Sequence, residues 1–89
     1  MRRFSIDGHA VALVRIGEAL YAVDDRCSHA NYSLSEGDLD CEMREIECPK
    51  HGSRFSLIDG SAITLPATVP VTVHEVTVEE NGDVVVVLS

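Results

Sequence analysis

The chain has 89 residues, 45% of them hydrophobic, and a net charge of −8 from 7 basic and 15 acidic side chains. This length is typical of one domain with a small core. The acidic surface repels nucleic acid and anionic membranes, and no apolar run approaches the roughly 18 residues of a membrane span. We therefore expect neither kind of partner. With no apolar leader after Met1, we expect a cytoplasmic protein.

Short runs rich in Val, Ile and Leu alternate with turn signals every eight to twelve residues, which predicts an all-β sandwich or barrel. Asp7-Gly8 and Asp59-Gly60 are hairpin turn signals, and Asn81-Gly82 favours a type I′ turn. The strands are expected at residues 4–6, 9–15, 19–23, 45–47, 55–58, 71–78 and 83–88.

Other stretches lack a strand pattern. Residues 30–40 are small and polar and are expected to form a loop with at most one helical turn. Pro66 and Pro70 exclude an interior strand between them.

Residues 84–87 are all Val and are interpreted as a strand buried on both faces. His9 and His74 have no cysteine nearby and are expected at the surface.

Two short motifs carry metal-binding chemistry. Cys27 and His29 are spaced C-x-H, Cys48 and His51 are spaced C-x2-H, and eighteen residues separate His29 from Cys48. Two thiolates and two imidazoles suit zinc or an iron–sulfur centre. Zinc sites usually pair cysteines in one knuckle and histidines in another, whereas here each motif has one of each. This mixed pairing favours a binuclear iron–sulfur cluster, with zinc as the alternative.

The third cysteine, Cys41, lies in an acidic stretch with no histidine nearby, so it is interpreted as a free thiol outside the metal site. Because the cysteine count is odd and the chain is expected to be intracellular, a disulfide framework is not expected.

Residues 27–29 (CSH) and 48–55 (CPKHGSRF) resemble the two cluster-binding loops of Rieske-type [2Fe–2S] proteins. Residues 59–67 and Pro70 resemble the region after the second loop in small bacterial Rieske ferredoxins. The resemblance implies a Rieske [2Fe–2S] cluster as cofactor and a small antiparallel β-sandwich or barrel. It also implies one domain, residues 1–89, with a cluster-binding part at about 26–66 inserted in a β base of about 4–25 and 67–89.

The same resemblance implies the roles of individual residues. Cys27 and Cys48 would hold the inner iron, and His29 and His51 the outer iron. Four further residues would surround the cluster: Pro49, Lys50, Gly52 and Ser53. Pro49 and Gly52 permit the tight bend of the loop, and Ser53 matches a serine that donates to a bridging sulfide. Leu34, Tyr32 and Pro66 are expected to cover the cluster.

The chain departs from the pattern of the high-potential Rieske proteins of respiratory complexes. Their two loops are joined by a disulfide between positions that are Tyr32 and Lys50 here. Phe55 stands where they place a tyrosine, and it cannot donate a hydrogen bond. Fewer donors stabilise the reduced cluster less. We therefore expect a reduction potential toward the low end of the roughly −150 to +300 mV Rieske range.

No nucleophile–base pair is suggested, and a cluster with all its iron positions taken by protein leaves no open site for substrate. This predicts an electron carrier and not an enzyme by itself. The resemblance implies transient docking that takes electrons from a flavin-dependent reductase to the terminal oxygenase of an aromatic-ring dioxygenase system.

Three other roles remain open: a Rieske protein of iron–sulfur assembly, a nitrite reductase small subunit, and a redox-sensing binding module. Lys50 and Arg54 are cations beside the second motif. They either dock a partner or offset local acidity.

Overall fold

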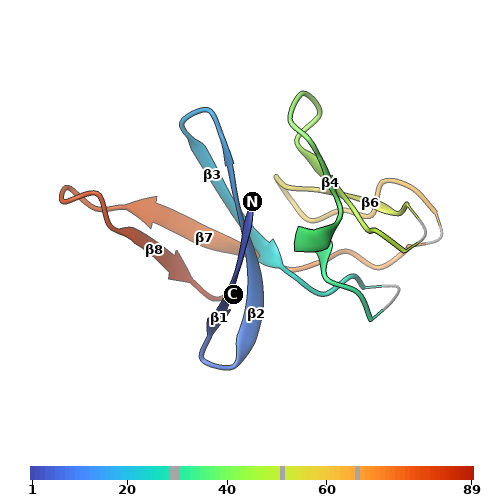
Figure 1. Ribbon diagram of the computed structural model, residues 1–89, viewed down its shortest axis with the longest axis horizontal. Coiled ribbons are helices and arrows are strands. Elements are labelled where there is room, and N and C mark those ends of the chain that lie inside the picture. The colour runs from blue at the N-terminus through green and yellow to red at the C-terminus, as the bar shows by residue number, and fades with distance from the viewer. Residues whose placement is uncertain (29–30, 51, 66) are drawn as a thin grey trace.

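The computed structural model describes residues 1–28, 31–50, 52–65 and 67–89, and it contains two antiparallel sheets (Figure 1). The larger sheet has the strand order β1-β2-β3-β7-β8 and the smaller one β4-β5-β6. The elements are β1 (Arg2–Ile6), β2 (His9–Ile16), β3 (Ala19–Asp24), the 3-10 turn η1 (Leu34–Glu36), β4 (Asp38–Asp40), β5 (Glu45–Glu47), β6 (Arg54–Ser56), β7 (Val73–Val78) and β8 (Val84–Val87). The predicted all-β class is confirmed.

The first hairpins follow the local turn signals. Ile6 pairs with His9, so Asp7 and Gly8 form a two-residue loop. Both have positive φ, 50° and 79°, as a type I′ turn requires. The next hairpin pairs Ile16 with Ala19 around a second two-residue loop. These turns set the register of β1, β2 and β3.

The last hairpin differs from the prediction. Gly82 has a φ of 91°, but Asn81 is not among the residues of positive φ, so the turn is not type I′. The amide of Gly82 donates to the carbonyl of Glu79, and the amide of Glu79 donates to the carbonyl of Asp83. A three-residue loop with glycine at its left-handed position connects the strands.

The prediction that residues 84–87 are buried on both faces is wrong. Strand β8 pairs only with β7 and lies at the edge of the sheet. Val84 and Val87 are 44% and 52% exposed. An unbroken valine run does not distinguish a central strand from an edge strand, because both favour β-branched residues.

The smaller sheet contains a strand that was not predicted. Residues 38–40, expected to be loop, form β4 and pair with Glu45–Glu47 of β5. The expected helical turn is present as η1. Two aspartates flank Leu39 in β4, so its strand conformation comes from pairing with β5 and not from intrinsic propensity.

One core joins the two sheets. Its members come from both of them and from the connections: Ala12, Val14, Val23, Cys27, Leu34, Ile46, Cys48, Phe55, Leu57, Ala67 and Val71. In Figure 1 the smaller sheet lies at one end of the molecule, and the β7–β8 hairpin projects at the other. Within the described residues, no helix is long and apolar enough to cross a membrane.

Candidate metal centre

Both predicted cysteine ligands emerge from strand ends into the core. Cys27 follows β3 and Cys48 comes directly after β5. Each is only 2% exposed, and both belong to the same buried cluster. Leu34, expected near the metal, is a fully buried member of that cluster. The fold therefore brings together two thiols that are 21 residues apart in the sequence.

The two cysteine-bearing loops are closed in the same way. In the first loop (residues 27–32), the amide of Cys27 donates to the carbonyl of Tyr32 at 3.0 Å. In the second loop (residues 48–53), the amide of Cys48 donates to the carbonyl of Ser53 at 2.7 Å. Gly52 has a φ of 74°, a conformation that glycine adopts without strain. Each bond joins residues five positions apart and fixes the backbone that carries the thiol.

A third segment fastens both loops. The hydroxyl of Ser28 in the first loop donates to the carbonyl of Val69. The hydroxyl oxygen of Ser53 in the second loop accepts from the amide of Ala67 at 3.2 Å. Ser53 is buried, and this bond leaves its hydroxyl proton available to donate. The bond from Ala67 gives the buried hydroxyl of Ser53 a partner at this depth. The bond from this hydroxyl to a sulfide remains a prediction.

Asp25 anchors the first loop, and it was not singled out from the sequence. Its carboxylate is 1% exposed, accepts from the amide of Ser35 at 2.9 Å and pairs with the guanidinium of Arg3 at 3.2 Å. Its carbonyl accepts from the amide of Leu34. The sequence signal was the pair Asp24-Asp25 just before Cys27, because a carboxylate that directly follows a strand into the core needs partners.

The two histidines outside the predicted metal-binding motifs, His9 and His74, have different surroundings. His9 is exposed as expected. The expectation that His74 is a surface residue is wrong, because it is 3% exposed. Its Nε2 lies 2.7 Å from a carboxylate oxygen of Asp24, and its Nδ1 accepts from the amide of Ser89. Since Nδ1 accepts, Nε2 carries the proton and donates to Asp24.

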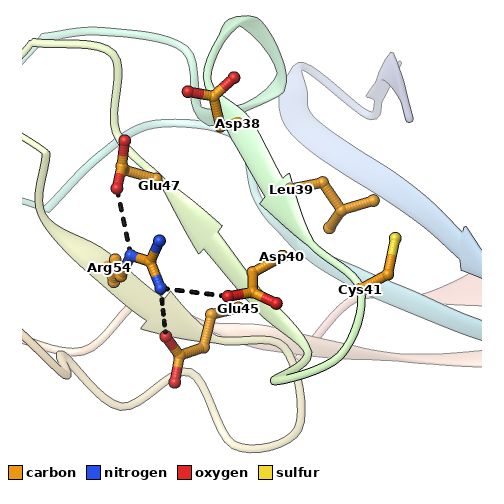
Figure 2. Close-up of a pocket in the computed structure, with 7 residues that line it drawn as sticks. All are labelled: Asp38, Leu39, Asp40, Cys41, Glu45, Glu47 and Arg54. Carbon is orange, nitrogen blue, oxygen red and sulfur yellow. Dashed lines mark hydrogen bonds and ion pairs between the residues drawn. The ribbon is translucent and has the colours of Figure 1, made fainter.

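Arg54 satisfies three carboxylates beside the second loop. Its guanidinium lies 3.1 Å from Glu47, 3.2 Å from Asp40 and 3.3 Å from Glu45. Figure 2 shows these carboxylates converging on Arg54 in a pocket of about 360 Å³. The amide of Met43 and the guanidinium of Arg54 hold the pKa of Asp40 below its usual value, and Glu47 foremost raises the pKa of Arg54. Of the two roles left open for Arg54, offsetting local acidity is the one observed.

Lys50 and Tyr32 connect the two loops directly. The ammonium of Lys50 lies 5.2 Å from the centre of the Tyr32 ring, within the range of a cation–π contact. Tyr32 is 42% exposed, so its ring is only partly buried, and its expected cover of the cluster stays a prediction. Cys41 is exposed and free, as expected.

Gly37, which directly precedes β4, allows the backbone there to approach the end of β5 and the second loop. A Cβ at this position would lie 1.8 Å from the carbonyl oxygen of Glu47 and 3.2 Å from Cδ of Pro49. Glu47 immediately precedes Cys48. A glycine with ordinary φ carries no sequence signal of such an approach, so Gly37 was missed.

Three predicted site residues, His29, His51 and Pro66, lie outside the described residues. The structure buries both cysteines in one cluster and also buries Ser53, whereas Gly52 is half-buried and Pro49 and Lys50 are exposed. The ligand set, with its two imidazoles, stays a prediction.

Known proteins are similar to this chain in sequence and in fold. The family model described as "Rieske [2Fe-2S] domain" matches residues 1–86. The chain belongs to the Rieske [2Fe–2S] family. A 3-phenylpropionate/cinnamic acid dioxygenase ferredoxin subunit of Escherichia coli (strain K12) is 47% identical over 74 residues, which cover 83% of this chain and 68% of the relative.

Two solved structures extend this comparison. The ferredoxin of carbazole 1,9a-dioxygenase from Nocardioides aromaticivorans IC177 superposes with a TM-score of 0.94 at 36% identity, covering 99% of this chain and 84% of the other. A chain in the complex of reduced oxygenase and oxidized ferredoxin in carbazole 1,9a-dioxygenase superposes with a TM-score of 0.88 at 42% identity, covering 97% and 86%. The Rieske fold expected from the sequence is confirmed, and the chain is an electron carrier of the dioxygenase ferredoxin type.

The residues present fit the family's cluster. Iron–sulfur clusters are held by thiolates, and the structure supplies two buried thiols on loops whose backbones are fixed by hydrogen bonds. Bound there, the cluster would accept and release one electron, while the protein controls its exposure and its hydrogen bonds.

Proposed function

We propose that this Rieske ferredoxin carries single electrons from a flavin-dependent reductase to the terminal oxygenase of an aromatic-ring dioxygenase system. Two similarities support the proposal. Over 97% of its length the chain resembles a chain of the complex between the carbazole dioxygenase oxygenase and its ferredoxin. It also resembles the E. coli dioxygenase ferredoxin subunit. The acidic charge of −8 supports rapid, salt-sensitive docking on a basic partner face. A carrier must leave each partner quickly, so the interface should be small.

The proposed ligands are Cys27 and Cys48 on one iron and His29 and His51 on the other. Burial of both thiols in one cluster supports the first pair. The spacing of the two motifs supports the second pair. Ser53, with its hydroxyl proton available, is proposed to donate to the cluster, and Pro49 and Gly52 to shape the loop around it.

Two wider proposals accompany these. The protein would work in the cytoplasm, without nucleic acid or membrane partners, because its acidic surface disfavours both. Residues 1–89 would form one domain in which the part at about 26–66 binds the cluster. Its three-stranded sheet and both loops support this division.

A reconstituted electron-transfer chain tests the proposal. Purified oxygenases of the 3-phenylpropionate and carbazole systems would be mixed with a flavin reductase, with or without this ferredoxin, and product formation followed. We expect turnover that rises with ferredoxin concentration and falls as salt is added. Cys48→Ser should abolish it, whereas Cys41→Ser, at the exposed thiol, should leave it unchanged. Turnover equal with and without the ferredoxin at both oxygenases would contradict the proposal and favour a sensing or assembly role.

A further inference from the structure

The two cysteine-bearing loops come from different parts of the fold. The first loop follows β3 of the larger sheet, and the second connects β5 and β6 of the smaller one. Loss of a metal centre held between them requires the loops to separate. Any contact that joins them directly therefore opposes that loss.

Hydrogen bonds to the third segment join the loops only indirectly. Ser28 binds Val69, and Ser53 binds Ala67. In contrast, Lys50 of the second loop places its ammonium over the ring of Tyr32 of the first, at 5.2 Å. This contact crosses from one loop to the other without an intermediate.

We propose that Lys50 and Tyr32 form a noncovalent clamp that holds the two loops together and slows loss of the metal centre. The inference rests on the proposed ligand set and goes beyond the proposed carrier role. It assigns Lys50 and Tyr32 as positioning residues, since they act through the loops that bear the thiols.

The charges around Lys50 support this assignment. The chain has 15 acidic residues, yet across the described ranges Lys50 forms no ion pair with a carboxylate. Its ammonium instead faces an aromatic ring. Arg54, only four residues later, is bound to three carboxylates. The two cations therefore have separate tasks: Arg54 neutralises the smaller sheet, and Lys50 contacts the opposite loop.

Exposure of the ring limits the strength of the clamp. Tyr32 is 42% exposed, and an exposed cation–π contact contributes roughly 0.5–1 kcal/mol. If the contact is broken before the metal centre leaves, its removal should speed release about two- to fivefold. Neither residue belongs to the buried core, so substitution removes no core packing.

A double-mutant cycle tests the clamp. The holoprotein and its Lys50→Met, Tyr32→Leu and doubly substituted forms would be mixed with excess iron chelator, and loss of visible absorption timed. Tyr32→Phe and Lys50→Arg retain a ring and a cation and serve as conservative rescues. Arg26→Met removes one exposed charge beside Cys27 and serves as the charge-matched control. Circular dichroism would establish that each variant is folded.

We expect each disruptive substitution to accelerate release about two- to fivefold, and the double substitution to add little beyond either one. The two rescues and Arg26→Met should match the parent. Additive effects, an unchanged rate in Lys50→Met, or failure of Tyr32→Phe to restore slow release would each overturn the clamp. Oxygenase turnover by freshly loaded variants is a separate readout, so the carrier role can fail while the clamp stands.

Discussion

Gly37→Ala should push the start of β4 away from the end of β5 and from the second cysteine loop. The added Cβ would lie 1.8 Å from the carbonyl oxygen of Glu47, whereas a close carbon–oxygen contact is roughly 3.3 Å. Backbone must therefore move by about 1.5 Å. Neither contacting group can rotate away, because one is a main-chain carbonyl and the other, Cδ of Pro49 at 3.2 Å, belongs to a ring.

The φ of Gly37 is −88°, so alanine suffers no conformational penalty there. Without the clash it would stabilise the fold by roughly 0.4–1 kcal/mol. Overpacking of this kind costs about 1–3 kcal/mol or more, which lowers the melting temperature by roughly 4–8 °C per kcal/mol in a domain of this size. Because Glu47 precedes Cys48, iron content after purification should fall as well.

The assay is thermal unfolding together with iron analysis. Gly17→Ala is the control: it has a φ of 62° with nothing within 4 Å of the added carbon. It should cost about 1 kcal/mol through backbone strain and keep full iron content. A Gly37→Ala protein as stable and as rich in iron as its parent would refute the steric reasoning.

Three further predictions follow from the surroundings of the site. Arg54→Met leaves Asp40, Glu45 and Glu47 without their shared cation, so the free energy of unfolding in urea should fall. This loss of stability should shrink in high salt. Arg15→Met is the control, because among described residues the Arg15 guanidinium contacts only the carbonyl of Gly17. An equal loss of stability in Arg15→Met would contradict the reasoning. The pKa of Asp40 is lowered in the folded state, so its contribution is complete above about pH 4 and disappears as pH falls through the lowered value. Asp40→Asn should therefore lose less stability than its parent on acidification below about pH 4, and identical urea midpoints across that range would exclude this linkage. Finally, protein-film voltammetry should give a midpoint potential toward the low end of the Rieske range and a lower one still in Ser53→Ala; a parent value above about +100 mV would count against the hydrogen-bond reasoning.

Local signals predicted much of the fold. Asp7-Gly8 determined its own hairpin, because two adjacent residues that tolerate positive φ are sufficient for a type I′ turn. Strand β4 could not be found in this way, since Asp38–Asp40 extends only by pairing with β5. His74 was placed at the surface because its carboxylate partner, Asp24, is 50 residues away in sequence.

The same distinction between local signals and long-range contacts applies to the metal site. Cysteine and histidine at short spacings reveal ligand chemistry locally, and the burial of Cys27 and Cys48 agrees with that interpretation. The contacts that hold the loops are long-range and have no local pattern: Ser53 with Ala67, Lys50 with Tyr32, and Gly37 against Glu47. The resemblance to Rieske proteins implies that the loop-joining disulfide of the respiratory members is absent here. In the structure, the residues at its two positions, Tyr32 and Lys50, contact each other.

Metal and sulfide analysis combined with electron paramagnetic resonance of the reduced protein tests the central claim most directly. We expect two irons and two acid-labile sulfides per chain, as the family's cluster requires. We also expect a signal that appears on one-electron reduction and is lost in Cys27→Ser or Cys48→Ser. Colourless protein with stoichiometric zinc and no such signal would contradict it.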